Sequence, residues 1–475
     1  MNRNQIKYLL FFFLLTGACK KDFLDIEDNT FFYRQQYVKN LATMSEFVNG
    51  ISMNYTILAE TGYMSAYPEI TADNLKPTDL ISGRLIPQYL WKQVADEISE
   101  SSFNSAWQNG YKIIRSCNFV IEEIGQYQSE NPEFADDLLA QAHFFRALVH
   151  FKLVNIFGQQ YNYTADAAHP GIPYITDSDI SKPYRRETVA VVYEKIAADY
   201  NRAIELFSAQ NTDVKRPNRL AAKALLARFY LQKQDFPKAL AYAKEVVNER
   251  PLMRIAQGYP EKLFHFIKDP SETEVLFQCS PNPRSAFNGS TFLGFHLGVL
   301  DQFHATNDIA QLLTETADDV RKVWISGSNG AYKIKKFPSL VPDVQGTFWV
   351  DAAYYQCVVR SSEMYLIIAE AAARTGDETT AKDYVTQLRQ RAAPSSAVVN
   401  ETGQGLLELI QKERRTELCF EGFRLYDLLR WKKGVNRIDA PISSAKDLPY
   451  PSDKAIAPIP LPDVNLMGIP QNKSY

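Results

Sequence analysis

The stretch NRLAAKALLARFYLQKQDFPKALAYAKEVVNER, Asn218–Arg250, returns in altered form 142 positions later as RSSEMYLIIAEAAARTGDETTAKDYVTQLRQRA, Arg360–Ala392. Both stretches show apolar residues at steps of three and four, which is typical of helices with one buried face. The shared positions are Ala227 and Ala369, Asp235 and Asp377, and Ala239 and Ala381. The repeat indicates that the chain builds its fold from paired helices.

A small residue inside a first helix, an aspartate at the turn and an alanine opening a second helix is the tetratricopeptide pattern, about 34 residues long. Small residues suit these positions because the two helices cross closely. We therefore predict a mostly α, tetratricopeptide-like scaffold with helical hairpins at about 103–158, 188–250 and 360–431. The alternative is an unrelated bundle of long helices.

Other segments support the helical prediction. LLAQAHFFRALVHFKLVNIFG, residues 138–158, is apolar at helical spacing, and WQNGYKIIRSCNFVIEEI, Trp107–Ile124, is amphipathic. A third helix is expected after Thr188, a plausible N-cap. Two stretches, about 52–102 and 251–350, lack such periodicity and are rich in Pro, Gly and aromatic residues. Because long insertions in a compact chain are often functional, we expect them to face a ligand.

The N-terminus contains LLTGACKKDFLD, Leu14–Asp25, after a positive leader and the short apolar run Tyr8–Leu15. That run is too short to cross a bilayer, which needs about 20 apolar residues. Residues 1–18 read as a lipoprotein signal peptide, with Cys19 as the acylated first residue of the mature chain. A plain secretory signal with an incidental cysteine is the alternative.

The charge and cysteine content of the chain limit the classes of partner and cofactor that it can bind. The net charge of −3 becomes −5 without residues 1–18, and no basic patch stands out, so a nucleic-acid partner is not expected. The four remaining cysteines are scattered, without a CxxC pair or a histidine at metal spacing. We expect free thiols and no metal or other cofactor. No acidic cluster has the spacing of a calcium loop.

The segment ERRTELCFEGFRLYDLLRW, Glu413–Trp431, resembles the C-terminal signature of the SusD/RagB outer-membrane lipoproteins. CKKDFLDIE after the signal, GIPYIT in the middle and the ending IAPIPLPDVNLMGIPQNKSY are similar to other parts of that family. The similarities run in order from residue 19 to residue 475, which favours a single SusD-like domain over that range.

The resemblance implies a lipid-anchored protein of the bacterial outer membrane that faces the exterior. It implies binding of a glycan, or of a peptide in a minority of members, and delivery to a TonB-dependent SusC-like barrel as a non-catalytic lid. The alternatives are a peptide-binding member and a tetratricopeptide scaffold that binds a protein partner on the membrane.

The signature is also intelligible from its residues alone. Leu418, Gly422, Leu425 and Leu429 form an apolar stripe at helical steps, with several Glu and Arg residues beside it. Charges so close to apolar surface must be paired, because an isolated buried charge is costly. We therefore predict an ion-pair network that fixes helix packing at this segment, and no ligand site.

Sugars pack their C–H faces on aromatic rings, and polar side chains satisfy their hydroxyls. The expected ligand-binding residues are therefore aromatic and polar residues of the two insertions: Tyr89, Trp91, Trp324, Tyr332, Trp349, Asp73 and Asn74. The alternative for the rings is packing in the core, and for the polar pair an ordinary turn.

An enzyme is not expected. Glu122-Glu123 and Asp136-Asp137 fit a glycosidase by residue type only, since neighbouring helix residues point apart. His143 and His150 lie on a dense apolar segment, where a core or edge histidine is the simpler interpretation. No nucleophile elbow, HExxH or phosphate loop occurs.

Overall fold

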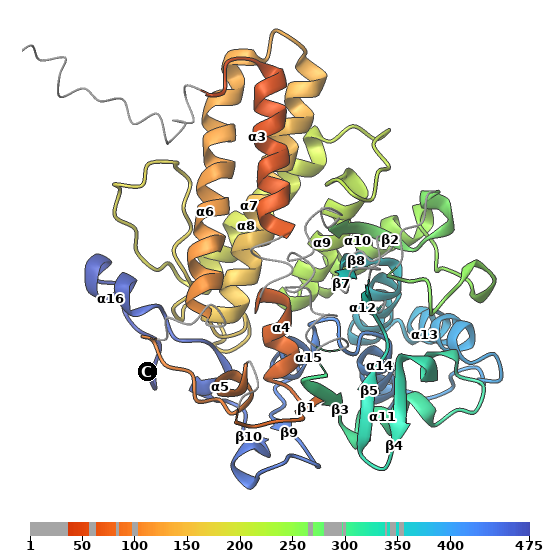
Figure 1. Ribbon diagram of the computed structural model, residues 1–475. Coiled ribbons are helices and arrows are strands. Elements are labelled where there is room, and N and C mark those ends of the chain that lie inside the picture. Colours follow the sequence, from red (N-terminus) through yellow and green to blue (C-terminus); the bar gives the residue numbers. More distant parts are fainter. Residues whose placement is uncertain are drawn as a thin grey trace, which may run out of the picture.

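The computed structural model describes residues 37–56, 63–81, 85–96, 103–264, 269–279, 297, 301–337, 340–342, 348–350 and 356–475. This part of the chain is mostly helical, as the sequence predicts (Figure 1). The long helices are α3 (Leu41–Asn54), α6 (Phe103–Glu123), α7 (Pro132–Phe157), α8 (Val189–Leu206), α9 (Arg219–Lys233), α10 (Phe236–Glu249), α12 (Ser361–Arg374), α13 (Glu378–Ala392) and α14 (Gly403–Glu417).

These helices form one continuous stack. Each helix from α6 to α10 packs against the next, α10 packs against α12, and α12 packs against both α13 and α14. Short helices complete the set: α4 (Tyr63–Ile70), α5 (Ile86–Tyr89), α11 (Asn307–Thr314), α15 (Arg424–Arg430) and α16 (Leu461–Met467). Single turns of 3₁₀ helix are η3 (Ile124–Tyr127), η4 (Ile255–Gln257), η5 (Pro270–Glu272), η8 (Val320–Trp324), η9 (Ser443–Ala445) and η10 (Asp453–Ala455).

Local sequence explains where the helices begin. The Asn131 side chain accepts from the Phe134 amide at 3.2 Å, and Pro132 occupies the first position of α7, where its missing N–H costs nothing. The predicted cap Thr188 is confirmed, since its Oγ1 accepts from the Val191 amide at 3.3 Å. A polar cap followed by an apolar face was enough to define both helices.

The repeat predicted from the sequence is confirmed in α9–α10 and α12–α13. Asp235 caps α10 through the Lys238 amide at 3.3 Å, and Asp377 caps α13 through the Thr380 amide at 3.1 Å. The four alanines at the crossings are fully buried: Ala227, Ala239, Ala369 and Ala381. The paired helices therefore approach as closely as the tetratricopeptide pattern requires.

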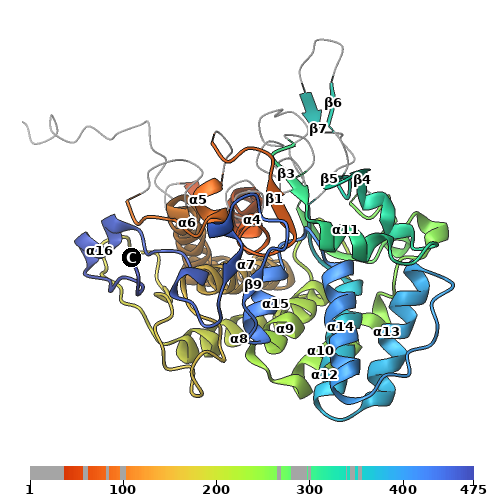
Figure 2. The ribbon, with the colours of Figure 1, turned by 90° about the horizontal axis from the view of Figure 1, so that it is seen from below.

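The two irregular stretches contain most of the short strands. The four-stranded antiparallel sheet has the order β1 (Leu75–Pro77), β3 (Phe303–Ala305), β5 (Ala331–Ile334), β4 (Ile325–Ser328). Three strand pairs accompany it: β2 (Val275–Cys279) with β8 (Gln356–Arg360), β6 (Leu340–Pro342) with β7 (Phe348–Val350), and β9 (Val435–Asn436) with β10 (Asp447–Leu448). Figure 2 shows β6 and β7 projecting beyond the sheet, on the side away from α12 and α13.

Two main cores hold the molecule together. The larger lies among α3, α6–α10 and α12, and the second lies beneath the four-stranded sheet. The prediction of free thiols is confirmed, and all four are buried: Cys117, Cys279, Cys357 and Cys419. Burial raises the pKa of Cys117 and Cys419, so these thiols act as small apolar side chains.

Candidate functional site

Asp73 and Asn74 lie just before β1, buried against the C-terminal part of the chain. The Arg424 guanidinium donates two hydrogen bonds to the Asp73 carboxylate, from Nε to Oδ1 at 2.6 Å and from Nη2 to Oδ2 at 2.8 Å. Asn74 accepts from Arg415 Nε at 2.8 Å and donates to Glu69 Oε1 at 2.8 Å. Burial alone would raise the pKa of Asp73, but Arg424 and Arg415 outweigh it and hold that pKa well below its usual range. Both side chains therefore serve to join α4 and β1 to α14 and α15.

Tyr89 and Trp91 enclose the buried guanidinium of Arg437. Its carbon lies 3.8 Å from the Tyr89 ring centroid and 4.2 Å from that of Trp91. The Arg437 nitrogens donate to four main-chain carbonyls, those of Ile70, Ala72, Tyr89 and Ala445, at 2.7–3.0 Å. Burial lowers the pKa of Arg437 to about 10. This arrangement is a cation held between two rings.

Trp324, Tyr332 and Trp349 lie apart from that group. The Trp324 ring is buried, with Lys336 Nζ 3.8 Å from its centroid. Tyr332 is half-buried on β5, on the side of the sheet that packs against the second core. Trp349 pairs with Val341 in the β6–β7 ladder, but its side chain lies outside the described residues, as does Cys19.

The structure thus brings Asp73, Asn74, Tyr89 and Trp91 together around Arg437 and Arg424, and it places Trp324 in another cluster. In this conformation the Tyr89, Trp91 and Trp324 rings are covered by protein. Packing, the alternative interpretation from the sequence, accounts for all three. Their roles as ligand contacts stay predictions, as do those of the other candidate residues.

A row of polar side chains on the outer face of the sheet was not found from the sequence. Lys76 lies opposite His304, and His304 lies opposite Lys333, so the three share one face of β1, β3 and β5. The opposite face carries buried apolar residues such as Leu75 and Ala305. We call Lys76, His304 and Lys333, with the carboxylates of Asp301 and Asp439, the sheet row.

The sheet row is partly open to solvent. Asp301 accepts from Lys333 Nζ at 2.8 Å and contacts His304 Nε2 at 3.1 Å, and Lys76 Nζ lies 2.7 Å from Asp439. The exposed fraction is 54% for the Lys333 side chain, 40% for Asp301 and 15% for His304. Asp439 Oδ1 is buried and has no hydrogen-bond partner among the described residues. A polar ligand can therefore reach one donor and one acceptor of the row, Lys333 and Asp301.

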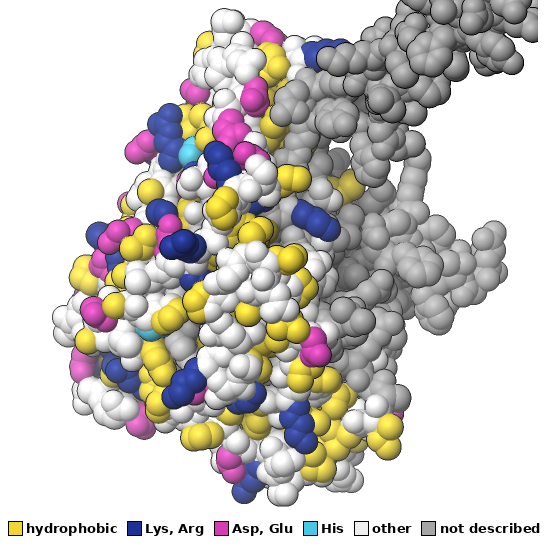
Figure 3. All heavy atoms as spheres, turned by 90° about the vertical axis from the view of Figure 1, so that its left-hand side faces the viewer, with side chains coloured by type: hydrophobic (Ala, Val, Ile, Leu, Met, Phe, Trp, Pro, Cys, Tyr) yellow, Lys and Arg dark blue, Asp and Glu magenta, His cyan; other side chains and the backbone are white. Residues whose placement is uncertain are grey.

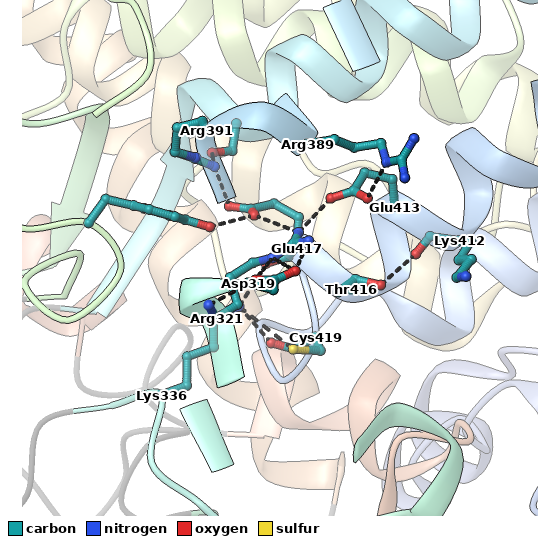
Figure 4. Close-up of polar contacts among 12 residues, drawn as sticks. Asp319, Arg321, Lys336, Arg389, Arg391, Lys412, Glu413, Thr416, Glu417 and Cys419 are labelled. Carbon is teal, nitrogen blue, oxygen red and sulfur yellow. Dashed lines mark hydrogen bonds and ion pairs between the residues drawn. The ribbon is translucent and has the colours of Figure 1, made fainter. Parts of the chain in front are cut away.

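The signature segment forms a buried charge network, which confirms the prediction from its residues. We call the following residues the Arg360 cluster: Arg321, Lys336, Arg360 and Arg391 with Glu274, Asp319, Glu413, Glu417 and Glu421. Figure 4 shows Arg321, Glu417 and Glu413 pointing toward one another from η8 and α14.

Glu417 is the centre of this cluster. Its carboxylate lies 2.7 Å from Arg360, 2.9 Å from Arg391 and 3.2 Å from Arg321. Burial opposes its ionisation, but these guanidinium groups hold the pKa of Glu417 well below its usual range. The side chains are buried and bonded to each other, so the cluster fixes helix packing. Arg391 Nε is buried in it without a hydrogen-bond partner among the described residues.

Glycine is required in the signature at one position. Gly422 has a φ of +85°, and a Cβ there would lie 2.4 Å from the Ser65 carbonyl oxygen. Its amide and that of Phe420 donate to the buried carboxylate of Glu69, at 3.2 Å and 2.9 Å. The Phe-Glu-Gly turn thus allows α14 and α15 to close on α4.

Two protein-family models match the chain. A family model described as "Starch-binding associating with outer membrane" matches residues 22–231, and one described as "SusD family" matches residues 302–457. The two matches together span more than three quarters of the chain. The chain is a member of the SusD/RagB family. The resemblance stated from the signature is therefore confirmed.

Similar members come from several bacteria. SusD-like protein P2 of Formosa agariphila is 26% identical, with 78% of this chain and 80% of that protein aligned. A SusD-like protein of Bacteroides ovatus is 23% identical, with 75% and 70% aligned.

Solved structures of other proteins have a similar fold over most of this chain. A putative sugar binding protein of Bacteroides vulgatus has a TM-score of 0.80 at 26% identity, covering 92% of this chain and 99% of that one. A SusD superfamily protein of Bacteroides thetaiotaomicron has a TM-score of 0.81 at 24% identity, covering 91% and 100%. The predicted SusD-like fold is confirmed.

Two further properties of this SusD/RagB member concern its described residues. None of their helices combines the length and apolarity needed to cross a bilayer, and they contain no group of three His, Cys, Asp or Glu side chains placed to hold a metal ion. On the face with α6 and α16, Figure 3 shows basic and acidic side chains interspersed, without a large area of one sign.

Proposed function

We propose that this SusD/RagB member is a surface-exposed outer-membrane lipoprotein that binds an oligo- or polysaccharide. It is anchored through acyl groups on Cys19 and delivers its ligand to a SusC-like TonB-dependent barrel as a non-catalytic lid. The observation that carries the proposal is membership of a family whose model is described by starch binding and outer-membrane association. A structural relative named for sugar binding supports it.

The polar side chains of the sheet row suit such a ligand. Sugar hydroxyls both donate and accept hydrogen bonds, and the row provides lysine donors beside aspartate acceptors. The charged groups are already paired, so a neutral sugar can bridge them without leaving a charge alone. Hydrogen bonds to charged groups contribute about 1.5–3 kcal/mol each.

The pKa values of the carboxylates in the Arg360 cluster argue against a role for them as catalytic acids. A glycosidase needs a carboxylic acid with a raised pKa close to its substrate. The pKa values of Glu417 and Glu421 are lowered by bonded cations, despite their burial. Burial raises the pKa of Glu69, but that group is enclosed and bonded to Asn74 and two amides.

Binding is tested with the purified chain from residue 20 onward, titrated with an array of soluble polysaccharides and peptides. Replacing Lys76 and Lys333 by alanine should weaken binding of the recognised glycan at least about tenfold, since each lysine supplies a charged donor. Lys473→Ala removes an equally charged but remote side chain, 87% exposed, and should change nothing.

One result would overturn the glycan proposal, and another would overturn only the sheet row as its site. One is no binding to any polysaccharide together with tight binding of a peptide. The other is glycan affinity that the double lysine variant leaves intact, which would exclude the sheet row as the binding surface.

The anchor is tested separately by Cys19→Ser in the full chain. The variant should move from the membrane fraction to the soluble fraction and keep its affinity for glycan. Retained membrane attachment, measured by fractionation and mass spectrometry of the N-terminus, would contradict acylation at Cys19.

A further inference from the structure

A cavity of about 850 Å³ lies on the helical side of the molecule, remote from the sheet row. It is formed where η4 and the residues around it face the ends of α12 and α13. Figure 2 shows α12 and α13 on the side opposite β6 and β7. The polar residues of its lining include Arg254, Gln257, Thr273, Tyr365, Gln387 and Gln390. We call it the Arg254 cavity; its volume lies in the range of small-molecule sites, about 300–1,000 Å³.

The residues that line the cavity in the described part of the chain include positively charged side chains and no negatively charged ones. Among the described residues that line it, two are arginines and three are glutamines, and none is an aspartate or glutamate. This is unusual for a chain with a net charge of −3. Apolar surface is supplied by residues such as Leu252 and Ile255, the latter 42% exposed. The cavity therefore combines an excess of donors with an apolar wall.

The two arginines differ in how far their charge is neutralised. Arg391 donates to Glu274 at 2.8 Å and to Glu417 at 2.9 Å, so its charge belongs to the Arg360 cluster. Arg254 is exposed and its Nε contacts only Gln257 Oε1, at 3.3 Å. Its terminal nitrogens have no hydrogen-bond partner in the described part of the chain. No ion pair joins Arg254 to a carboxylate among the described residues, although Asp383 and Glu274 contact other lining residues.

The glutamines are held in place by the protein. Gln387 Nε2 donates to Asp383 at 3.0 Å, and Gln390 Nε2 donates to the Ser396 carbonyl at 3.2 Å. Being three residues apart on α13, the two amides lie on the same side of the helix. With Nε2 engaged, each amide is oriented, and its oxygen remains to accept a hydrogen bond from a ligand hydroxyl.

We propose that the Arg254 cavity is a second carbohydrate site, specific for a short acidic saccharide whose carboxylate or sulfate pairs with Arg254. The guanidinium binds such an anion through two parallel hydrogen bonds, while the glutamine oxygens accept from ring hydroxyls. The apolar wall at Leu252 and Ile255 packs against the C–H face of the sugar. The site goes beyond the proposed glycan surface because it shares no residue with the sheet row.

The test is calorimetric titration of the purified full chain with a galacturonate trisaccharide, a sulfated galactose and the uncharged galactose trisaccharide. At least one acidic probe should bind, and the uncharged trisaccharide should bind this site at least about tenfold more weakly, because it lacks the charged partner. Arg254→Ala and Gln387→Ala should each weaken the acidic probe several-fold, and together about tenfold or more. These side chains are exposed, so the variants should keep the thermal unfolding midpoint of the parent.

Two controls separate this proposal from the glycan surface. Arg202→Ala removes an exposed arginine from α8 and should leave binding of the acidic probe unchanged. The Lys76 and Lys333 double variant should also leave it unchanged. The ligand should slow hydrogen exchange of amides 252–257, which a site at the sheet row would not do.

The proposal is overturned if neither acidic probe binds, or if the Arg254 and Gln387 variants bind like the parent. Binding of the acidic probes that is lost only in the lysine double variant would also overturn it, while leaving the glycan surface supported. Loss in the Arg254 variants alone would support this site independently of the sheet row.

Discussion

The Arg360 cluster and the sheet row contain similar side chains in opposite surroundings. In the cluster, Arg360 is 2% exposed and Glu417 is fully buried, and every cation is bonded to a carboxylate. In the row, the Lys333 and Asp301 side chains are about half exposed. The cluster lies between packed helices, whereas the row lies on a sheet face that is partly open to solvent.

The two groups differ in how easily their charges could bond to a ligand. A charge in the cluster cannot leave its partners without a large loss of stability, because its desolvation is compensated only by them. A charge in the row is partly hydrated and can exchange one partner for another at small cost. Charge density alone therefore does not locate a binding surface.

Among the variants considered, Glu417→Gln should destabilise the folded chain most. The substitution keeps the shape but removes the charge that balances three guanidinium groups, and it should lower the free energy of unfolding by about 3–5 kcal/mol. The urea unfolding midpoint measures this. Glu408→Gln, on an exposed position of α14, is the matched control and should have almost no effect. A loss below about 1 kcal/mol for Glu417→Gln would show that the cluster does not stabilise the helices.

Arg437→Met tests a buried cation bonded to carbonyls instead of carboxylates. Four carbonyl oxygens would lose a charged donor, and the two rings would lose the group between them. We expect a loss of about 2–3 kcal/mol by the same measurement. Trp91→Leu should also lower stability, because the Trp91 ring packs on Arg437. Unchanged stability together with loss of glycan binding would show that Trp91 contacts the ligand and does not support Arg437.

Acid should remove the stability that Asp73 contributes to the folded chain. The pKa of Asp73 is lower in the folded chain than in the unfolded chain, where it is about 3.9. As the pH falls through about 4, the unfolded chain takes up a proton first, so the stability contributed by Asp73 is lost on acidification. Each unit of pKa difference contributes about 1.4 kcal/mol. Unfolding midpoints from pH 7 to pH 3 should fall less steeply for Asp73→Asn than for the parent; parallel curves would contradict this.

Lys333→Ala tests an exposed charge of the sheet row. It removes an exposed ion pair with Asp301, and such pairs contribute only about 0–1 kcal/mol. The unfolding midpoint should therefore stay within error of the parent while glycan affinity falls. A stability loss as large as that of Glu417→Gln would place Lys333 among the structural charges.

The helical part of the fold was predictable because its signals are local. Asp235 and Asp377 each cap a helix within three residues of themselves, and the buried alanines recur at fixed distances from them. The pairing of the signature charges was also predictable, since Glu417 stands beside an apolar stripe that must be buried. The helix caps needed no contact between distant segments, but the cations that pair with Glu417 lie outside the signature, at Arg321, Arg360 and Arg391.

The sheet row and the Arg437 site were not predictable, because they depend on such contacts. β1 and β3 have three residues each, too few for an alternating pattern, and more than 200 positions separate them. Tyr89 and Trp91 were recognised as aromatic residues in an irregular stretch, but their partner Arg437 lies 348 positions beyond Tyr89. No property of either ring in the sequence points to a cation so far along the chain.

The contacts of the segment before β1 also constrain the order in which the chain can fold. Asn74 meets Arg415 across 341 positions, Asp73 meets Arg424 across 351, and Ala72 meets Arg437 across 365. Helices α6 to α10 need only neighbours and can form early during synthesis. The segment before β1 can bond to Arg437 only after residue 437 has been synthesised, so this side of the molecule stays open until the last tenth of the chain is made.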